Sequence, residues 1–178
     1  MSGATDNDVL LAYVEAARHG DDQALGRLVR ATQAVVHRFC VNFSSIDEAD
    51  DLAQEVFIRA VRNLPQYRGD APVVSWLLSI ARHVCADQVR RNQRRTRLVN
   101  RLRNERPTTT VGVGELHLTS LIDALDRDRR MAFVLTQVIG LSYDEAAATC
   151  NCPVGTIRSR VARARADLMS AVRDAEAQ

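Results

Sequence analysis

The sequence predicts an all-α protein made of two small helical domains joined by a flexible linker. Apolar residues recur with a helical period in nearly every segment, and no segment alternates polar and apolar residues as a strand does. The period is lost over residues 96–118, which places a linker there. With 178 residues, 46% of them apolar and 26% charged, the chain can form two domains with modest cores.

Four helices are expected in the first domain, residues 1–95. Asp6 or Asp8 can cap the first helix, and a His-Gly-Asp break follows Arg18. The third helix is the clearest, because its apolar residues follow the i, i+3, i+4, i+7 rule, with acids at its start and Arg at its end. On the fourth, Trp76 falls on the apolar stripe. The helices are expected over about residues 6–18, 22–43, 47–64 and 73–95, with a loop at 65–72.

Charge is uneven along the chain, and all 24 basic residues are Arg. Residues 1–89 carry 8 Arg and 12 acids, residues 90–106 carry 8 Arg and one acid, and residues 107–178 carry 8 Arg and 9 acids. A basic block between two mildly acidic regions suggests contact with a polyanion. Charge alone slightly favours the alternative, a solvated helix end.

The second domain is expected over residues 119–178, with short helices at 119–125 and 128–139, and it ends in a helix-turn-helix. Ser142 and Glu145 have the spacing of a capping box, in which each side chain accepts from the other residue's amide. Asn151 tolerates the left-handed conformation of a tight turn, and Pro153 suits the start of the next helix. Gly140 suits the position after the preceding helix.

The last helix has one packing seam and one basic face. The seam is Val154, Ile157, Val161, Ala164 and Leu168, and the other face is Thr156, Arg158, Ser159, Arg160, Arg163 and Arg165. A helix this basic, entered by a short turn, can lie in a DNA major groove, where Arg binds guanine edges. A helical hairpin with a solvated Arg face is the alternative, and the capping box, turn and basic helix together favour DNA binding.

No membrane span, metal site or cofactor is predicted. No apolar run is long enough to cross a membrane, and residues 1–8 are polar and acidic, so a cytoplasmic protein is expected. The cysteines are Cys40, Cys85, Cys150 and Cys152. In a reducing compartment we expect them to be structural thiols. His37 lies near Cys40 and His83 near Cys85, but neither pair has the spacing of a zinc site.

Two stretches together resemble the extracytoplasmic-function group of bacterial RNA polymerase sigma factors. The first is Asp-Glu-Ala-Asp-Asp-Leu-Ala-Gln-Glu-Val-Phe-Ile-Arg-Ala at 47–60, continuing through Tyr-Arg-Gly-Asp at 67–70 to Trp-Leu-Leu-Ser-Ile-Ala-Arg at 76–82. The second is Gly-Leu-Ser-Tyr-Asp-Glu-Ala-Ala at 140–147 with Pro-Val-Gly-Thr-Ile-Arg-Ser-Arg at 153–160. Both occur in the family's order and at its spacing, and the resemblance covers roughly residues 8–173.

The resemblance implies a polymerase specificity subunit with no catalytic residues of its own. Residues 1–95 would dock on core RNA polymerase and recognise and melt the −10 element, residues 96–118 would be a basic linker, and residues 119–178 would read the −35 element. Core RNA polymerase and promoter DNA are the implied partners, and an anti-sigma factor is typical of the family.

The resemblance also assigns residues to three contacts. The implied polymerase-docking face is Asp47, Asp50, Asp51, Gln54, Glu55 and Arg59. The implied −10 contacts are Tyr67, Arg68, Asp70, Arg82, His83, Asp87, Arg90 and Arg91. The implied −35 contacts are Gly155, Thr156, Arg158, Ser159, Arg160 and Arg163. Tyr67 would offer a stacking surface and Asp70 an acceptor to an unstacked base.

The sequence departs from the family pattern in places. Cys152 stands where an aliphatic residue is common, Asp126 replaces a frequent Pro, and Val73-Val74 stand where many relatives have Phe.

Two other functions are alternatives. A dimeric helix-turn-helix repressor or activator would explain residues 119–178 but gives the first domain no role. A metal-dependent nucleic-acid enzyme would need a convergent carboxylate or His/Cys site, which the sequence does not suggest.

Overall fold

The computed structural model describes residues 3–103 and 118–176, and within these ranges it contains helices and no strand. The α-helices are α1 (Gly3–Arg18), α2 (Asp22–Val41), α3 (Ile46–Asn63), α4 (Val73–Arg103), α5 (Leu118–Ala124), α6 (Arg127–Phe133), α7 (Tyr143–Cys150) and α8 (Val154–Glu176). A 3-10 turn covers Leu64–Gln66, and a π-helical turn covers Val134–Val138. The predicted all-α fold class is confirmed.

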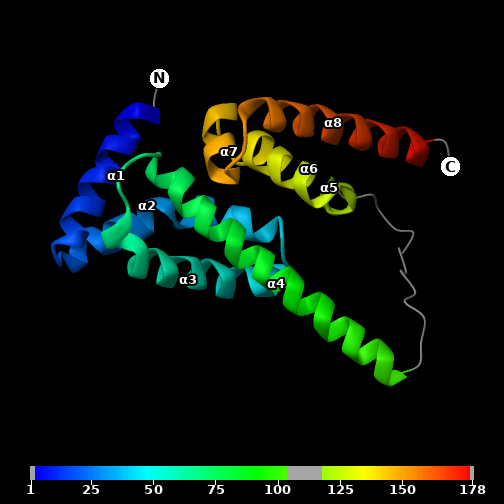
Figure 1. Cartoon of the computed structure of the whole chain (residues 1–178), viewed down its shortest axis with the longest axis horizontal. Helices are drawn as coiled ribbons and strands as arrows, with labels where there is room; N and C mark the ends of the chain where they lie inside the picture. Colours follow the sequence, from blue (N-terminus) through cyan, green and yellow to red (C-terminus); the bar gives the residue numbers. More distant parts are fainter. Residues whose placement is uncertain (1–2, 104–117, 177–178) are drawn as a thin grey trace.

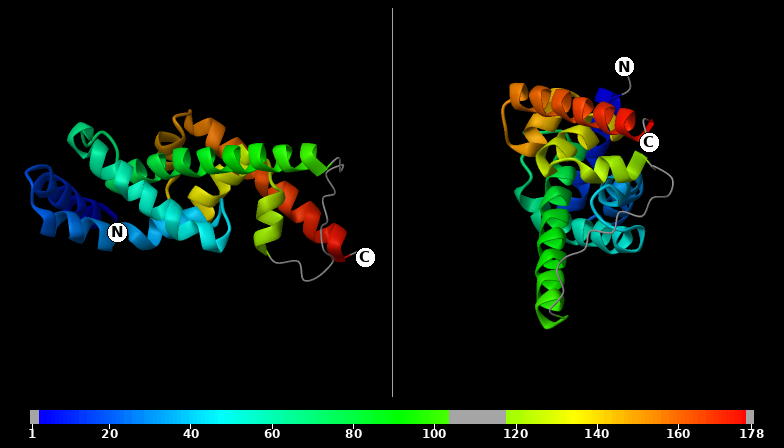
Figure 2. Two further views of the ribbon diagram at one scale, coloured as in Figure 1. Left: turned by 90° about the horizontal axis from the view of Figure 1, so that it is seen from below. Right: turned by 90° about the vertical axis from the view of Figure 1, so that its right-hand side faces the viewer.

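The helices form two groups that lie side by side. Helices α1–α4, the first half, pack on one another, and α5–α8, the second half, gather around α8 (Figure 1). Helix α7 lies against the first part of α4, so residues far apart in the chain meet there. The far end of α4 extends beyond the other helices (Figure 2). One hydrophobic cluster runs through both halves.

Helix α3 buries one face because its apolar residues recur every three or four positions. Ala49, Leu52, Val56 and Ala60 are buried against α2 and α4. Helix α4 faces them with a second stripe, in which Leu77 is fully buried. Removing such apolar surface from water is the main stabilisation of a helical domain of this size. Because the apolar face of α3 is buried, its acidic face is directed toward solvent.

Side-chain acceptors bind backbone amides at the starts of α2 and α4. The Asp21 carboxylate accepts from the amides of Gln23 at 2.9 Å and Ala24 at 3.0 Å, which caps α2. The amide of Val73, at the start of α4, donates to Oδ1 of Asn7 on α1 at 3.0 Å. The first helix therefore holds the start of the fourth, next to the 65–72 loop.

Two helix boundaries differ from the sequence prediction. Helix α4 continues to Arg103, whereas the loss of apolar period suggested an end near residue 95. Arg, Gln and Leu have high intrinsic helix propensity, so a helix can persist there without an apolar face. The remainder of the predicted linker, residues 104–117, lies outside the described residues. The predicted 128–139 helix is also wrong in detail, because the amide of Ile139 bonds to Val134 O at 2.9 Å in a π-helical turn.

The helix-turn-helix forms as the sequence predicts. Ser142 Oγ accepts from the Glu145 amide at 3.2 Å, and the Glu145 carboxylate accepts from the Ser142 amide at 2.8 Å. This is the predicted capping box. Asn151 has a φ of 51°, and Gly140 has a φ of 89°. Both lie in the left-handed region, as expected of residues that end helices.

We expect Asn151 to tolerate glycine but not a β-branched residue. Asn151→Val should lower the free energy of unfolding by about 1–2 kcal/mol, because an L side chain without local hydrogen bonding is strained at positive φ. Asn151→Gly should change it by less than about 1 kcal/mol, because glycine adopts this conformation freely. Urea denaturation of the two variants measures the difference, and equal losses would contradict the conformational argument.

Candidate nucleic-acid interface

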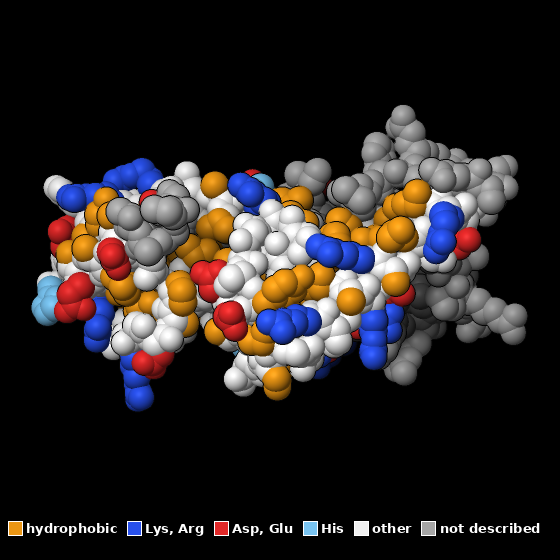
Figure 3. All heavy atoms as spheres, turned by 90° about the horizontal axis from the view of Figure 1, so that it is seen from above, with side chains coloured by type: hydrophobic (Ala, Val, Ile, Leu, Met, Phe, Trp, Pro, Cys, Tyr) orange, Lys and Arg blue, Asp and Glu red, His pale blue; other side chains and the backbone are white. Residues whose placement is uncertain are grey.

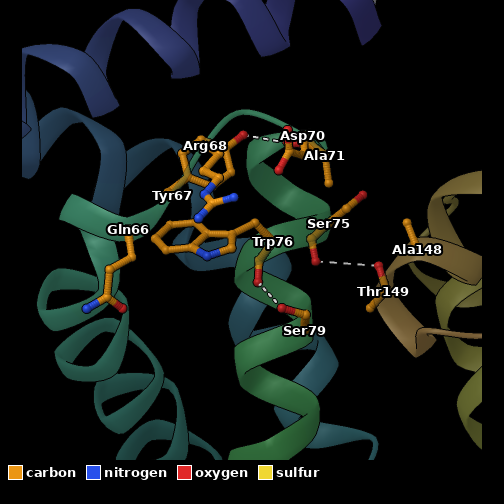
Figure 4. Close-up of a pocket in the computed structure, with 10 residues that line it drawn as sticks. All are labelled: Gln66, Tyr67, Arg68, Asp70, Ala71, Ser75, Trp76, Ser79, Ala148 and Thr149. Carbon is orange, nitrogen blue, oxygen red and sulfur yellow. Dashed lines mark hydrogen bonds between the residues drawn. The ribbon is translucent and has the colours of Figure 1, made fainter.

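A pocket of about 390 Å³ opens where the 65–72 loop meets the start of α4. Figure 4 shows the side chains around it, which come from the loop, from α4 and from α7. They are Gln66, Tyr67, Arg68, Asp70, Ala71, Ser75, Trp76, Ser79, Ala148 and Thr149. The pocket therefore joins aromatic rings, a cation and a carboxylate, which are the groups that hold an unstacked base.

Both aromatic residues of the pocket, Tyr67 and Trp76, also pack within the fold. Tyr67 is only 6% exposed, its hydroxyl donates to Ala71 O at 2.5 Å, and its ring centroid lies 4.7 Å from that of Trp76. Burial raises the pKa of Tyr67, with the nearby charge of Asp70 adding to the effect. The expectation that Tyr67 offers an open stacking surface is corrected. Trp76 packs against the hydrophobic cluster, as its place on the core stripe predicts, and it is also partly exposed and lines the pocket.

Further along α4, the predicted DNA-facing residues form a charged row. Arg82 donates to His83 Nε2 at 3.2 Å, and partial burial, followed by the charge of Arg82, lowers the pKa of His83. Arg91 is exposed, and Arg90 donates to Asp87 at 2.6 Å. At neutral pH the row therefore presents a neutral imidazole among guanidinium groups, which is compatible with contact to phosphates.

The predicted docking face of α3 is partly free and partly engaged within the fold. Asp47, Asp51 and Gln54 are exposed, and Asp50 lies 3.1 Å from His37 on α2. Asp50 and Gln54 line an apolar groove of about 470 Å³ between α2 and α3, to which Phe57 contributes. Sequence reasoning missed this groove, because its lining comes from two helices.

Glu55 and Arg59 connect α3 to α4. Arg59 donates to Glu55 at 2.7 Å and to Asp87 at 3.3 Å. The hydrogen bonds from Arg90 and then from Arg59 lower the pKa of Asp87 below its ordinary value. Three residues assigned to contacts with other molecules thus also hold two helices of the first half together.

The lowered pKa of Asp87 predicts a pH dependence of stability. Because ionised Asp87 is favoured in the folded state, its stabilisation is present above the ordinary carboxyl pKa and is lost as pH falls through the lowered pKa. Asp87→Asn should therefore lower stability at neutral pH by at most about 1 kcal/mol, as befits a partly exposed pair, and the difference should vanish once the pH falls below the lowered pKa of Asp87. Urea midpoints across this range measure it, and a difference that persists in acid would point to packing instead.

The basic face of α8 is exposed in part. Arg158, Ser159 and Arg163 are exposed, while Ile157 and Val161 are buried against the second half. Figure 3 shows basic side chains spread over the face where α8 lies. Gly155 is also exposed, and nothing lies within 4 Å of where its Cβ would be. The start of α8 is thus open to the approach of a phosphate.

Arg160 does not share the exposure of its neighbours. Its guanidinium pairs with Asp128 on α6 and donates to Cys152 Sγ at 3.9 Å. Arg165 likewise donates to Gln137 at 2.6 Å. Arg160, which the resemblance places among the −35 contacts, is thus engaged within the fold by an acid 32 positions earlier in the chain.

The second half covers part of the pocket. Thr149 Oγ1 on α7 donates to Glu145 O of its own helix at 2.8 Å, and it also lies 3.4 Å from Ser75 O on α4 (Figure 4). At a second contact, Arg130 on α6 donates to Asn42 O and lies 5.0 Å from the Phe43 ring. Among the described side chains, three buried polar atoms have no hydrogen-bond partner, and they are Ser75 Oγ, Arg82 Nε and Arg130 Nε. Two of these atoms, Ser75 Oγ and Arg130 Nε, belong to residues that make the contacts between the halves, so some polar groups at this contact are buried without a hydrogen bond.

The four cysteines are free thiols, with Cys40 and Cys85 buried and Cys150 and Cys152 partly buried. Within residues 3–103 and 118–176, no group of three or more His, Cys, Asp or Glu side chains could hold a metal ion. A search of the same residues finds no helix long and apolar enough to cross a membrane.

Two family models match the chain. Residues 28–95 match sigma-70 region 2, and residues 116–168 match sigma-70 region 4. The first match contains α3, the pocket loop and most of the described part of α4. The second contains the helix-turn-helix.

Curated relatives match nearly the whole chain. The ECF RNA polymerase sigma factor SigC of Mycobacterium tuberculosis is 42% identical over 94% of this chain and 93% of its own length. The ECF RNA polymerase sigma-E factor of Escherichia coli is 33% identical over 85% of this chain and 88% of its own length.

Two solved structures share the fold. One is CnrH in complex with the cytosolic domain of CnrY, with a TM-score of 0.69 and 25% identity over 96% of this chain and 97% of that one. The other is the sigma factor RpoE in complex with the anti-sigma factor NepR from Bartonella quintana. Its TM-score is 0.67, with 28% identity over 83% of this chain and 96% of that one.

Proposed function

This chain belongs to the extracytoplasmic-function group of RNA polymerase sigma factors, and we propose that it binds core polymerase through α3 and reads promoter DNA with α4 and α8. Polymerase carries out the catalysis, and the chain supplies the specificity. The cytoplasm, where polymerase and chromosome are found, is the proposed location.

One observation carries the assignment of surfaces. A single small helical unit holds both an acidic exposed helix face and a concave pocket lined by aromatic and charged side chains. A repressor that binds an operator through its helix-turn-helix needs neither feature. A subunit that must attach to polymerase and capture an unpaired base needs both.

The proposed docking surface is the exposed side of α3 with the adjacent α2–α3 groove. Asp47, Asp51 and Gln54 supply charge and polarity, and the groove supplies apolar area beside Phe57. Ile58 and Val61 are 39% and 43% exposed on the same helix. Apolar anchors surrounded by charges are typical of specific protein interfaces. The expected partner surface is basic with apolar residues along a helix.

The proposed −10 reader is the pocket and the charged row that follows it on α4. Trp76 offers a partly exposed ring, Asp70 an acceptor, and Arg68 a cation at the pocket mouth. Arg91 and Arg94 continue the positive surface toward the protruding part of the helix. Base capture in the pocket with phosphate contacts along the helix would hold one DNA strand in the opened state.

The proposed −35 reader is the start of α8. Arg158, Ser159 and Arg163 face outward from a helix that its own buried seam holds in place. Arg158 and Arg163 are the candidates for base or phosphate contact, and Gly155 and Thr156 for phosphate contact at the helix start. Arg160 would act by holding α8 on α6 through Asp128.

Reading both elements at once requires the halves to separate. Elements centred near −10 and −35 lie about 85 Å apart along B-form DNA, at 3.4 Å per base pair. In the structure, α7 contacts α4 directly through Thr149 and Ser75. The described arrangement is therefore a closed form, and polymerase binding is expected to favour an open one.

An anti-sigma factor is a further proposed partner. The solved relative RpoE holds the anti-sigma factor NepR. A protein that bound this chain across both halves would stabilise the closed form and oppose polymerase binding.

Run-off transcription tests the proposed function. Purified chain added to core polymerase on genomic DNA should yield discrete transcript 5′ ends that neither component gives alone. The alternative, a dimeric helix-turn-helix repressor, would instead give a symmetric operator footprint without polymerase and no new transcripts.

A further inference from the structure

Cys40 and Cys85 face each other inside the first half. Cys40 on α2 is 0% exposed and Cys85 on α4 is 1% exposed, and the Cys85 thiol donates to Cys40 Sγ at 4.0 Å. A disulfide needs about 2.05 Å between its sulfur atoms. Side-chain rotation and a small approach of α2 to α4 would close the difference. No role in docking or DNA reading accounts for this thiol pair.

A cavity at the contact between the halves reaches Cys85. Its volume is about 220 Å³, and its walls include Cys85, Phe43 and Val89 from the first half and Arg130 and Met131 from the second. Arg130 also binds Asn42 O and lies over Phe43, two residues that closely follow Cys40 in the chain. The second half thus covers the approach to the thiols.

We propose that Cys40 and Cys85 are a redox-modification site that a hydroperoxide oxidises to a disulfide, and that separation of the two halves exposes it. The bond fastens α2 to α4 within the half that carries the pocket and the docking face. This chemistry does not depend on polymerase or DNA binding, so it stands or falls separately from the proposed function.

The reaction needs one peroxide and produces two waters. The sulfur of Cys85, which lines the cavity, attacks one peroxide oxygen as its proton is lost. The O–O bond breaks, giving a sulfenic acid and, with that proton, one water. Cys40 sulfur then attacks Cys85 Sγ, the S–S bond forms, and the hydroxide released takes the Cys40 proton as the second water. The two thiols lose two electrons, and the peroxide gains them.

The closed form protects the pair. The hydrogen bond to Cys40 and burial raise the pKa of Cys85, and a protonated, buried thiol reacts slowly. Opening would hydrate the cavity and remove part of this burial. Arg130, which covers the approach to the thiols, is held incompletely, because its Nε is buried without a hydrogen-bond partner. Oxidation should therefore follow the opening of the halves.

The second thiol pair supplies the control. Only one residue separates Cys150 from Cys152, which leaves little freedom for a bond between them. Burial, with a smaller effect of the neighbouring Cys152, raises the pKa of Cys150 to about 11. A protein with Cys150→Ser and Cys152→Ser should oxidise like the unaltered chain, whereas Cys40→Ser or Cys85→Ser should not form the bond.

The test treats the full chain with hydrogen peroxide, blocks remaining thiols with a maleimide, and measures intact mass and linked peptides over time. We expect a Cys40–Cys85 peptide and the loss of two hydrogens. Thr149→Arg, at the contact farther from the thiols, and Arg130→Gln, at the cover, should each speed the reaction at least about tenfold. Circular dichroism before treatment selects variants that are folded.

Any of four results would overturn the proposal. Two of them concern the site: linkage of other cysteines in the unaltered chain, or formation of a disulfide at an unchanged rate in Cys40→Ser, would show that Cys40 and Cys85 are not the pair that is oxidised. A folded Thr149→Arg protein that is more open by small-angle scattering yet oxidises no faster would contradict the claim that separation of the halves exposes the thiols. If neither the unaltered protein nor the more open Thr149→Arg protein forms the disulfide, the proposal is wrong. None of these results would bear on polymerase binding.

Discussion

Asp51→Arg is expected to weaken binding to core polymerase by at least about 30-fold, equivalent to about 2 kcal/mol. Asp51 is exposed on α3, where it lines a groove between α3 and α4 on the other side of the helix from the α2–α3 groove, together with Glu48 and Glu55. Placing a cation there against the basic partner surface that we propose creates like-charge repulsion, and such contacts cost several kcal/mol. Stability should be unchanged, because the side chain lies outside the hydrophobic cluster.

Asp8→Arg provides the matched control. Asp8 is exposed on α1, a helix outside the proposed docking face, so the same charge change there should leave polymerase affinity within about twofold. Glu55 is a poorer choice for charge reversal, because it holds Arg59, which also binds Asp87. Fluorescence anisotropy against core polymerase measures both variants. Equal effects of the two substitutions would reject α3 as the docking face.

Arg158→Ala is expected to weaken promoter binding by the assembled holoenzyme by about 5- to 150-fold, the range for losing one base-reading Arg. Arg158 is exposed near the start of α8, beside the buried seam that contains Ile157 and Val161. If it reads a base, the loss should be confined to promoters that carry that base pair. If it binds a phosphate, the loss should be uniform and the salt dependence should fall by about one charge.

Arg173→Ala controls for the general charge of α8. Arg173 is exposed on the same helix, almost three turns beyond Arg163, and it donates to Met169 O at 3.3 Å. Its removal should change promoter affinity little, and neither variant should alter polymerase affinity. A weakening by Arg173→Ala equal to that by Arg158→Ala would show that α8 acts only as a diffuse positive charge.

Local features of the fold could be predicted because each depends on neighbouring residues. Ser142 and Glu145 form their capping box within one helical turn, and Asn151 takes the left-handed conformation that its side chain tolerates. The buried stripe of α3 follows from residue spacing alone. These features depend on little beyond the segment in which they occur.

Features that depend on distant partners could not be predicted. Tyr67 is buried because Ala71 O and the ring of Trp76 are held against it by the turn into α4. Arg160 is engaged because α6 brings Asp128 beside α8. The meeting of Thr149 with Ser75 joins residues 74 positions apart, for which neither segment carries a local signal.

The candidate site also has a part that could be predicted from the sequence and a part that could not. Its residue types and helices could be named from the sequence, whereas the α2–α3 groove and the pocket wall formed by Thr149 need the three-dimensional packing. The assignments of α3 to polymerase and of α4 and α8 to DNA remain predictions until variants are measured. The part of α4 beyond residue 95 was not predicted, because the prediction relied on an apolar period and this part is helical through intrinsic helix propensity alone.

Competition for core polymerase is the measurement that we would make first. The purified chain should form a one-to-one complex with core polymerase, and excess primary sigma factor from the same cell should displace it. The Asp51→Arg protein should compete poorly and the Asp8→Arg protein as well as the unaltered chain. A folded, inhibitor-free protein that neither binds polymerase nor competes, but protects a symmetric operator by itself, would contradict the proposed function.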